Sequence, residues 1–386
     1  MTGAPRRVLL ADGGPPAALA CARSLVRAGW RVEASRAGRG DRAPRSRGVE
    51  PFPAPAPSKE APEFAREVLA RARAGDRPAI LPCSEAAVLA LGTRRQELEA
   101  TADLLLPPPA VLEGALDKRR TLAIAAKAGV AVPRTFAAGD ADSAAGCPLA
   151  FPLVVKPCRS RWITSGGNVA GSGPAFAADA EALRKAVQRN ADLGCPASLV
   201  QEWAPGTGYG VSALMRGGEA AALFLHRRLR EVHPAGGPSS AAEAIPPEPA
   251  LVDPALALLR AMGWEGLAMV EFRRGGAGPP VLMEVNGRPW GTMGLAVDAG
   301  VDFPRLLAEG HAGPPPVYRA GLRRRWLAGD LRRLGAAMAG KPAGYPGEFP
   351  SVGRALADIL VSGAPDFVFR WADPGPFLGE VAGVFA

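Results

Sequence analysis

The sequence predicts a mixed α/β and α+β protein that opens with a parallel sheet and continues into a body built around β-hairpins. Two observations carry this prediction: an early strand–turn–helix–strand pattern, and two long apolar hairpins in the second half. At 386 residues the chain exceeds one average domain. We expect an N-terminal α/β domain over 1–108, a two-lobed body over 109–313 with a lid lobe at about 150–205, and a mainly helical basic appendage over 314–386.

The N-terminal part alternates strands and helices, as expected for an open parallel sheet. The turn at 12–16 is Asp-Gly-Gly-Pro-Pro, not the GxGxxG of a dinucleotide site, and its prolines remove backbone N–H donors. We therefore do not expect a dinucleotide here. The expected elements are strands at 7–12, 31–35 and 79–82, helices at 17–28, 60–74 and 84–91, and a loop at 36–58.

The body alternates less regularly and contains the hairpins. A helix ends at Gly129, and a turn at Gly217-Gly218 joins two strands within 211–231. The other expected elements are strands at 153–156 and 198–203, a Gly/Ser-rich loop at 165–173, helices at 179–193 and 253–262, and a second hairpin from 266–274 and 281–288.

Composition excludes several classes of protein. The formal net charge is +9, but the basic residues are dispersed except in the C-terminal third and form no aromatic–basic array, so nucleic-acid binding is not expected. Five scattered cysteines without a CxxC pair argue against disulfides and a zinc site. No apolar run is long enough for a membrane span, and the N-terminus predicts a strand rather than a signal peptide, so we expect a cytoplasmic protein without a transmembrane segment.

The chemistry is concentrated in the second hairpin. Glu271 lies in one apolar strand, and Glu284 and Asn286 share a face of the next, since side chains two apart in a strand point the same way. Two carboxylates and an amide oxygen form a hard-oxygen site suited to Mg²⁺, with Mn²⁺ as a substitute. Arg288 follows, where a guanidinium can hold a transferring phosphoryl group. The competing interpretation is two solvent-facing glutamates on an amphipathic strand, which the apolar neighbours disfavour.

Two lysines are candidates for phosphate contacts. The chain has only six lysines, yet Lys156 ends a wholly apolar strand and Lys118 opens a helix after Asp117. A lysine ammonium is a compact charge suited to phosphate oxygens. The Gly/Ser-rich loop just after Lys156 is placed to cover phosphates with backbone N–H groups, although a flexible surface turn has the same composition.

The order of these motifs resembles the ATP-grasp superfamily. It comprises Asp117-Lys118, the Lys156 strand, the Gly-rich loop, Gln201-Glu202-Trp203, Glu271 and then Glu284-x-Asn286-x-Arg288. The likeness runs from about Asp117 to Leu307, and more loosely over residues 1–108, which are similar to a pre-ATP-grasp domain. Within the superfamily, the strings at 226–231, 263–272 and 284–291 are most similar to bacterial predicted carboxylate–amine ligases, with an ATP-binding domain like that of the carbamoyl-phosphate synthase large chain.

The resemblance implies roles for these residues. Lys118 and Lys156 would contact ATP phosphates, and Gln201, Glu202 and Trp203 would hold adenine at the hinge between the lobes. The metal ligands would be Glu271, Glu284 and Asn286, and Arg288 would steady an acyl phosphate. Many relatives have an acidic ribose contact just past the hinge, where this chain has Gly206-Thr207-Gly208-Tyr209-Gly210; Thr207 or Tyr209 would have to substitute.

Arg228 and Arg230 are the candidates for substrate recognition. They are two apart in an expected strand, so we expect them on one face, where they would capture a substrate carboxylate or the phosphates. The alternative is an exposed basic strand edge. In the C-terminal appendage, residues 318–334 predict an amphipathic helix that packs Leu322, Trp326, Leu327, Leu331 and Leu334 on the core, and a membrane-surface or partner role is the alternative.

These observations lead to an expected function. We expect an ATP- and Mg²⁺-dependent ligase that activates a small-molecule carboxylate as an acyl phosphate and joins it to an amine. A carbamoyl-phosphate-type enzyme or carboxylase that activates bicarbonate is the alternative within the same fold, and a non-catalytic ATP-binding regulatory protein is the alternative outside catalysis. A homodimer is compatible with the sequence.

Overall fold

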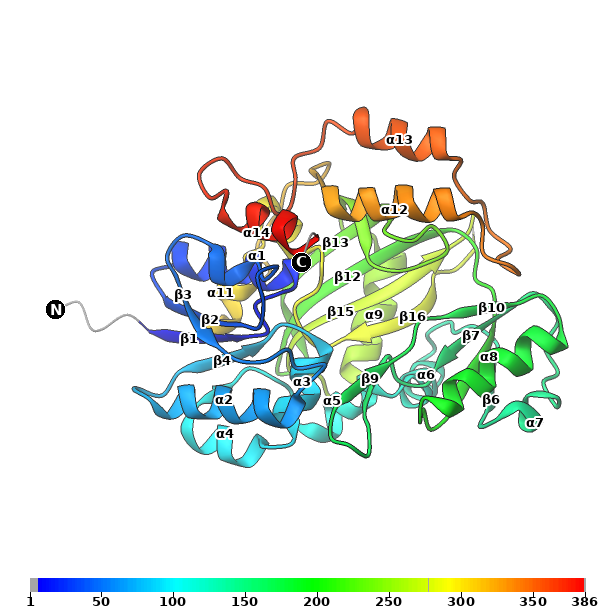
Figure 1. The fold of residues 1–386 in the computed structure, drawn as a ribbon, viewed down its shortest axis with the longest axis horizontal. Helices are drawn as coiled ribbons and strands as arrows, with labels where there is room; N and C mark the ends of the chain where they lie inside the picture. The colour runs from blue at the N-terminus through cyan, green and yellow to red at the C-terminus, as the bar shows by residue number, and fades with distance from the viewer. Residues whose placement is uncertain (1–5, 277, 385–386) are drawn as a thin grey trace.

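A computed structural model describes residues 6–276 and 278–384, and in it the chain forms an N-terminal part, a lid, a central sheet and a C-terminal helical layer (Figure 1). The lid and the central sheet lie side by side, and the C-terminal helices cover one edge of the assembly. The expected fold class is confirmed: a parallel N-terminal sheet is followed by antiparallel sheets.

The N-terminal part is a five-stranded parallel sheet in the order β3-β2-β1-β4-β5 with helices on its faces. The expected loop at 36–58 is wrong in part, because β3 lies within it. This strand lies at the edge of the sheet, where proline is tolerated because one side of the strand has no neighbouring strand to bond. Within β3, only the side chain of Phe52 is buried. The elements are β1 (Arg7–Ala11), α1 (Pro16–Arg27), β2 (Arg31–Arg36), a 3₁₀ turn (Ala43–Arg45), β3 (Val49–Pro53), α2 (Ala61–Arg73), β4 (Ala79–Pro82), α3 (Glu85–Gly92), α4 (Arg95–Thr101) and β5 (Asp103–Leu104).

Two helices lead from this sheet to the lid. Asp117 caps the second of them by accepting a hydrogen bond from the backbone N–H of Arg119 at 2.9 Å, which places Lys118 at the first helical position. The lid is an antiparallel sheet in the order β10-β7-β11-β6, covered by α8 through apolar contacts. The elements are α5 (Pro109–Leu116), α6 (Lys118–Lys127), β6 (Thr135–Ala138), α7 (Ala141–Ala144), β7 (Leu153–Pro157), β8 (Arg161–Ile163), β9 (Val169–Gly171), β10 (Ala175–Ala177), α8 (Ala180–Asp192) and β11 (Ser198–Glu202).

The central sheet has the order β16-β15-β12-β13-β14-β17 and is antiparallel throughout. One face packs on α9, α5 and α6. The other face packs partly on α1, α10 and α11, and the rest of it faces the lid. The elements are β12 (Thr207–Arg216), β13 (Glu219–Glu231), β14 (Ser239–Ile245), α9 (Pro249–Ala261), β15 (Gly266–Arg274), β16 (Val281–Asn286), α10 (Met293–Ala299) and α11 (Phe303–Ala308).

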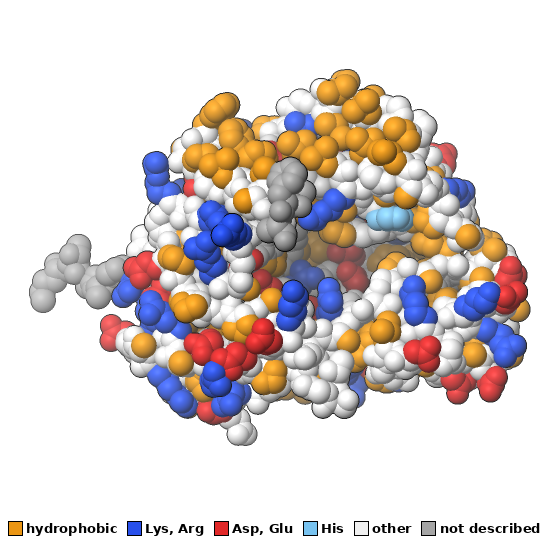
Figure 2. All heavy atoms as spheres, in the orientation of Figure 1, with side chains coloured by type: hydrophobic (Ala, Val, Ile, Leu, Met, Phe, Trp, Pro, Cys, Tyr) orange, Lys and Arg blue, Asp and Glu red, His pale blue; other side chains and the backbone are white. Residues whose placement is uncertain are grey.

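The C-terminal segment adds β17 (Arg323–Arg325), α12 (Leu327–Ala339), α13 (Val352–Leu360) and α14 (Gly375–Val384). The expected helix over 318–334 is wrong before residue 327, because β17 pairs with β14 instead. Leu331 is 53% exposed rather than packed on the core. Apolar side chains gather on the outer surface of this layer (Figure 2). Among the described residues, no helix combines the length and the apolar character that crossing a membrane requires.

Candidate active site

A cavity of about 440 Å³ opens between the lid and the central sheet. Figure 2 shows the corresponding hollow, with acidic and basic side chains inside it. Ten of the eleven site residues predicted from the sequence line this cavity: Lys118, Lys156, Gln201, Glu202, Trp203, Arg228, Glu271, Glu284, Asn286 and Arg288. Segments more than 150 residues apart in the sequence therefore converge on one cleft.

The two strands of the second hairpin bring the acidic residues together. Glu271 of β15 lies directly opposite Glu284 of β16. Asn286 Nδ2 donates to one oxygen of each glutamate, at 3.2 Å in both cases. A half-turn of the Asn286 amide would present its oxygen beside the two carboxylates, which is the donor set that Mg²⁺ prefers. Within 6–276 and 278–384, no group of three or more His, Cys, Asp or Glu side chains could hold a metal ion, so this site depends on the amide.

The two carboxylates differ in their electrostatic surroundings. Burial raises the pKa of Glu271 to about 7, although Arg228 opposes that effect. Burial also acts to raise the pKa of Glu284, but Lys118 and the hydrogen bond from Asn286 outweigh it, and the pKa is lowered. A divalent cation between the two would favour the ionised form of both carboxylates. The residues present therefore fit a magnesium ion.

The two lysines come from different elements, Lys118 from the start of α6 and Lys156 from β7 of the lid, and both line the cavity. Lys118 Nζ donates to Ser160 Oγ at 2.6 Å and lies 4.0 Å from Glu284 Oε2. Burial lowers the pKa of Lys156 to about 8, against the opposing effect of Glu284. A desolvated ammonium gains most from a new anionic partner, so both lysines suit phosphate oxygens. The Gly/Ser-rich loop contains β9 and contributes Ser172 to the cavity wall.

The residues that the sequence predicts as adenine contacts lie at the end of β11 and just after it. Glu202 pairs with Arg134 at 3.0 Å, and Gln201 Nε2 donates to Thr135 Oγ1 at 3.0 Å, so β11 is fixed against β6. Trp203 follows the strand and lines the cavity. Its backbone N–H donates to no group in the described part of the chain.

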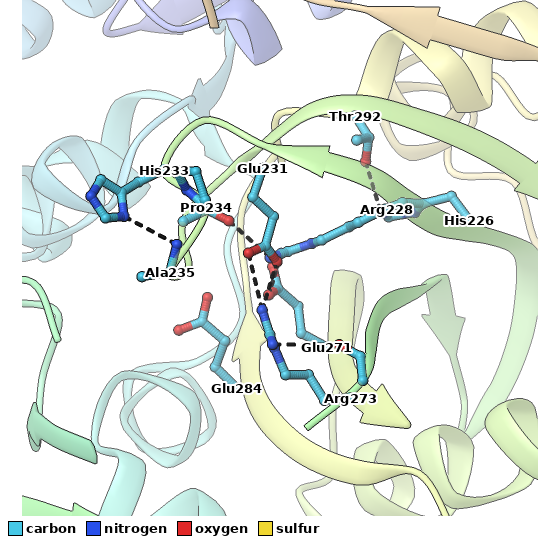
Figure 3. A network of polar contacts seen from close by, with 12 residues as sticks. His226, Arg228, Glu231, His233, Pro234, Ala235, Glu271, Arg273, Glu284 and Thr292 are labelled. Carbon is cyan, nitrogen blue, oxygen red and sulfur yellow. Dashed lines mark hydrogen bonds and ion pairs between the residues drawn. The ribbon is translucent and has the colours of Figure 1, made fainter. Parts of the chain in front are cut away.

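Sequence reasoning missed Glu231 and Arg273, which form a charged network with Arg228 and Glu271 (Figure 3). Arg228 bonds Glu271 with one nitrogen, and with another it contacts Glu231 at 3.2 Å and the carbonyl of Gly237 at 2.9 Å. Arg273 donates to both oxygens of Glu231 at 3.0 Å. Both missed residues line the cavity. A period-two pattern could have found Arg273, which lies two residues after Glu271 on the same strand.

The glycines of β12 explain how this network fits. A Cβ at Gly210 would lie 2.2 Å from His226 Cε1, and one at Gly208 would lie 2.8 Å from Arg228 Cδ. Side chains at these positions would therefore collide with those of β13. The neutral form of His226 is favoured because burial lowers its pKa to about 3. The glycines of the segment 206–210, where many relatives have an acidic ribose contact, thus leave space for the side chains of Arg228 and His226 to lie flat on the sheet.

Arg230 lies outside the cavity, contrary to the expectation that it shares a face with Arg228. Its guanidinium pairs with Asp330 of α12 at 2.7 Å and 3.0 Å. The pairing of β13 with β14 shifts register between Arg228 and Arg230 and again after Arg230, which breaks the alternation. Arg288, by contrast, lines the cavity, and no group in the described part of the chain accepts from its buried Nε.

Comparisons with known proteins agree with this geometry. Residues 194–329 match the protein family described as ATP-grasp in the biosynthetic pathway with Ter operon. No curated protein sequence matches significantly.

Several solved structures share the fold. A Campylobacter jejuni biotin carboxylase in complex with β,γ-ATP has a TM-score of 0.66 and 16% identity, over 82% of this chain and 74% of that one. An L-amino acid ligase from Bacillus licheniformis has a TM-score of 0.59 and 18% identity, over 81% and 74%. The biotin carboxylase domain dimer of a Hydrogenobacter thermophilus 2-oxoglutarate carboxylase, solved with MgADP and bicarbonate, has a TM-score of 0.63 and 16% identity, over 82% and 73%. Over residues 194–329 this chain is therefore similar to an ATP-grasp family, and it shares the fold of the solved structures named above.

Proposed function

We propose that this protein is a Mg²⁺-dependent ligase that uses ATP to activate a carboxylate and joins it to an amine. The observation that carries the proposal is the convergence of Glu271, Glu284 and Asn286 with Lys118 and Lys156 in one cleft. Phosphoryl transfer requires charge neutralisation around the triphosphate more than any covalent participation by the protein. This cleft supplies that neutralisation from both of its walls.

The charge balance of the cleft favours anionic ligands. Five cationic side chains line it (Lys118, Lys156, Arg228, Arg273 and Arg288) against four carboxylates (Glu202, Glu231, Glu271 and Glu284). Glu202 is already paired with Arg134 outside the charged cluster. The side chains of the cleft therefore have excess positive charge, and ATP together with a substrate carboxylate would neutralise it.

The residues would divide the work as follows. Trp203 and its neighbours would hold adenine, and the two lysines would hold the phosphates in line with the incoming carboxylate. Attack of a carboxylate oxygen on the γ-phosphorus releases ADP and forms an acyl phosphate; attack of the amine then forms the amide and releases phosphate. Arg288, whose buried Nε has no hydrogen-bond partner among the described residues, would stabilise the charge that develops on the transferring group.

Magnesium would be held by Glu271, Glu284 and Asn286. When bound there, it would neutralise phosphate charge and polarise the γ-phosphoryl group. Arg228 forms an ion pair with one carboxylate oxygen of Glu271. When magnesium binds Glu271, Arg228 would contact an anionic group of the substrate or the nucleotide instead.

Bicarbonate is the alternative substrate, since two of the similar structures are biotin carboxylases and one of them was solved with bicarbonate. The similarity to an L-amino acid ligase favours amide formation instead. A cytoplasmic location, a homodimer and the division of the chain at residues 108 and 313 stay predictions from the sequence.

An ADP-release assay tests the proposal. Purified protein, ATP and Mg²⁺ are combined with a panel of amino acids, other small carboxylates and amines, and separately with bicarbonate. We expect ADP release that requires both a carboxylate and an amine. Release with bicarbonate alone would favour the carboxylase-type alternative, and tight ATP binding without any turnover would favour a regulatory protein.

A further inference from the structure

The loop between α12 and α13 reaches the nucleotide end of the cleft. We call residues 341–349 the strap; in Figure 1 the chain between α12 and α13 descends toward β10. The ring of its Tyr345 contacts that of Phe176 on β10, with centroids 4.8 Å apart and an edge-on geometry. It also approaches the Trp203 ring at the hinge, at 6.3 Å. Tyr345 Oη donates to the carbonyl of Pro234 at 3.2 Å, so one buried side chain touches lid, hinge and central sheet.

Two glycines allow the strap to approach closely. Gly344 has a φ of +73°, and a Cβ there would lie 3.0 Å from the backbone nitrogen of Ala178 in the lid. A Cβ at Gly347 would lie 2.5 Å from Tyr345 Oη and 3.0 Å from Trp203 Cζ2. The strap is therefore fitted to the lid and hinge surfaces rather than lying loosely on them.

The preceding helix is fixed to the central sheet. Asp330 of α12 pairs with Arg230 at 2.7 Å, and Arg333 Nη1 donates to the carbonyl of Glu231 at 3.2 Å. Glu231 in turn holds Arg228 and Arg273 in the cleft. The strap thus has one end anchored on the strand that carries the charged network.

We infer that the strap ties the lid to the central sheet and that Tyr345 is a positioning residue for nucleotide binding. Tyr345 does not line the cavity, whereas Phe176 and Trp203 do, so its effect would pass through these two rings. The inference rests on the proposed function in taking this end of the cleft as the adenine end. It gives the C-terminal segment a role in the site: orienting the hinge wall and limiting lid opening.

Two measurements on the full-length protein test this inference. Titration calorimetry measures the affinity for ATP in the presence of Mg²⁺. Hydrogen–deuterium exchange in the absence of nucleotide measures how strongly the backbone amides of the lid are protected from exchange. Tyr345→Ala removes both ring contacts, each typically about 0.5–1.5 kcal/mol, so we expect ATP to bind about tenfold more weakly and the lid to exchange faster. Tyr345→Phe keeps the rings and loses only the bond to Pro234, so its affinity should stay within about threefold of wild type.

Controls separate the strap from general damage. Trp371→Ala removes a 90% exposed aromatic ring of the same C-terminal layer and should change neither measurement. Gly347→Val should displace Trp203 and reproduce the effect of Tyr345→Ala on ATP affinity and lid exchange. If Tyr345→Ala does not fold, the two measurements on Gly347→Val test the inference instead. Wild-type affinity and lid protection in both strap variants, or an equal loss in Trp371→Ala, would overturn the inference. Absence of ATP binding by wild type would instead refute the proposed function, and the exchange comparison would still test the strap.

Discussion

Replacing Lys156 by methionine should change stability and ATP affinity in opposite directions. The difference between the ordinary lysine pKa of 10.5 and the value of about 8 corresponds to roughly 3 kcal/mol against the charged form. Part of this side chain still reaches the cleft, so we expect a gain of about 1–2 kcal/mol in the ligand-free variant at pH 7. The same change removes a charge-assisted phosphate contact of about 1.5–3 kcal/mol, so ATP should bind at least about tenfold more weakly.

The pH dependence follows from the sign of the pKa change. The pKa of Lys156 is lower in the folded protein, which therefore binds fewer protons than the unfolded chain between about pH 8 and 10.5. Wild-type stability should rise with pH across that window relative to Lys156→Met. The assays are denaturant unfolding at several pH values and ATP titration by calorimetry. Lys185→Met is the matched control, since Lys185 is exposed and pairs with Glu181 on the surface of α8. Equal ATP affinity of Lys156→Met and wild type would refute the reasoning.

Three further changes test other parts of the cleft. Glu284→Gln should lower ADP release at least about 100-fold with little change in melting temperature, and EDTA should do the same to wild type; residual activity above a tenth would contradict the metal assignment. Arg228→Met leaves the buried carboxylate of Glu271 without its cationic partner, whereas Glu231 keeps Arg273, so unfolding should be easier by about 3 kcal/mol in urea and Mg²⁺ should restore part of the loss. Gly210→Ala should destabilise the protein by about 1–3 kcal/mol through its collision with His226, whereas Gly92→Ala, which meets no atom within 4 Å, should not.

Local sequence pattern was sufficient to predict that Glu271, Glu284 and Asn286 lie together. Glu284 and Asn286 are two apart in an uninterrupted strand, and the short connection between the strands of the hairpin constrains which residues face Glu271. A carboxylate within apolar residues is a strong signal because burial without a partner is costly. The same reasoning located Lys156 at the end of its strand.

Local sequence pattern did not predict the structure where it depends on pairing between segments that are distant in the sequence. Arg230 leaves the face of Arg228 because of bulges in the pairing with β14, a strand that composition did not indicate. The edge strands β3 and β17 are short and rich in proline or arginine, and they form only because a neighbour offers unpaired backbone groups. The contacts of Tyr345 with Phe176 and Trp203 span more than 140 residues, and nothing local to the strap predicts them.

Transfer of a labelled oxygen tests the central claim most directly, because a carboxylate that is activated as an acyl phosphate gives one of its oxygens to the released phosphate. A carboxylate substrate identified in the ADP-release screen is labelled with ¹⁸O and incubated with the protein, ATP, Mg²⁺ and the amine, and the phosphate is analysed by mass spectrometry. We predict one ¹⁸O atom in the phosphate for each amide formed, and none with Glu284→Gln. Phosphate that is released at the same rate as wild-type turnover but contains no ¹⁸O would contradict carboxylate activation in this cleft.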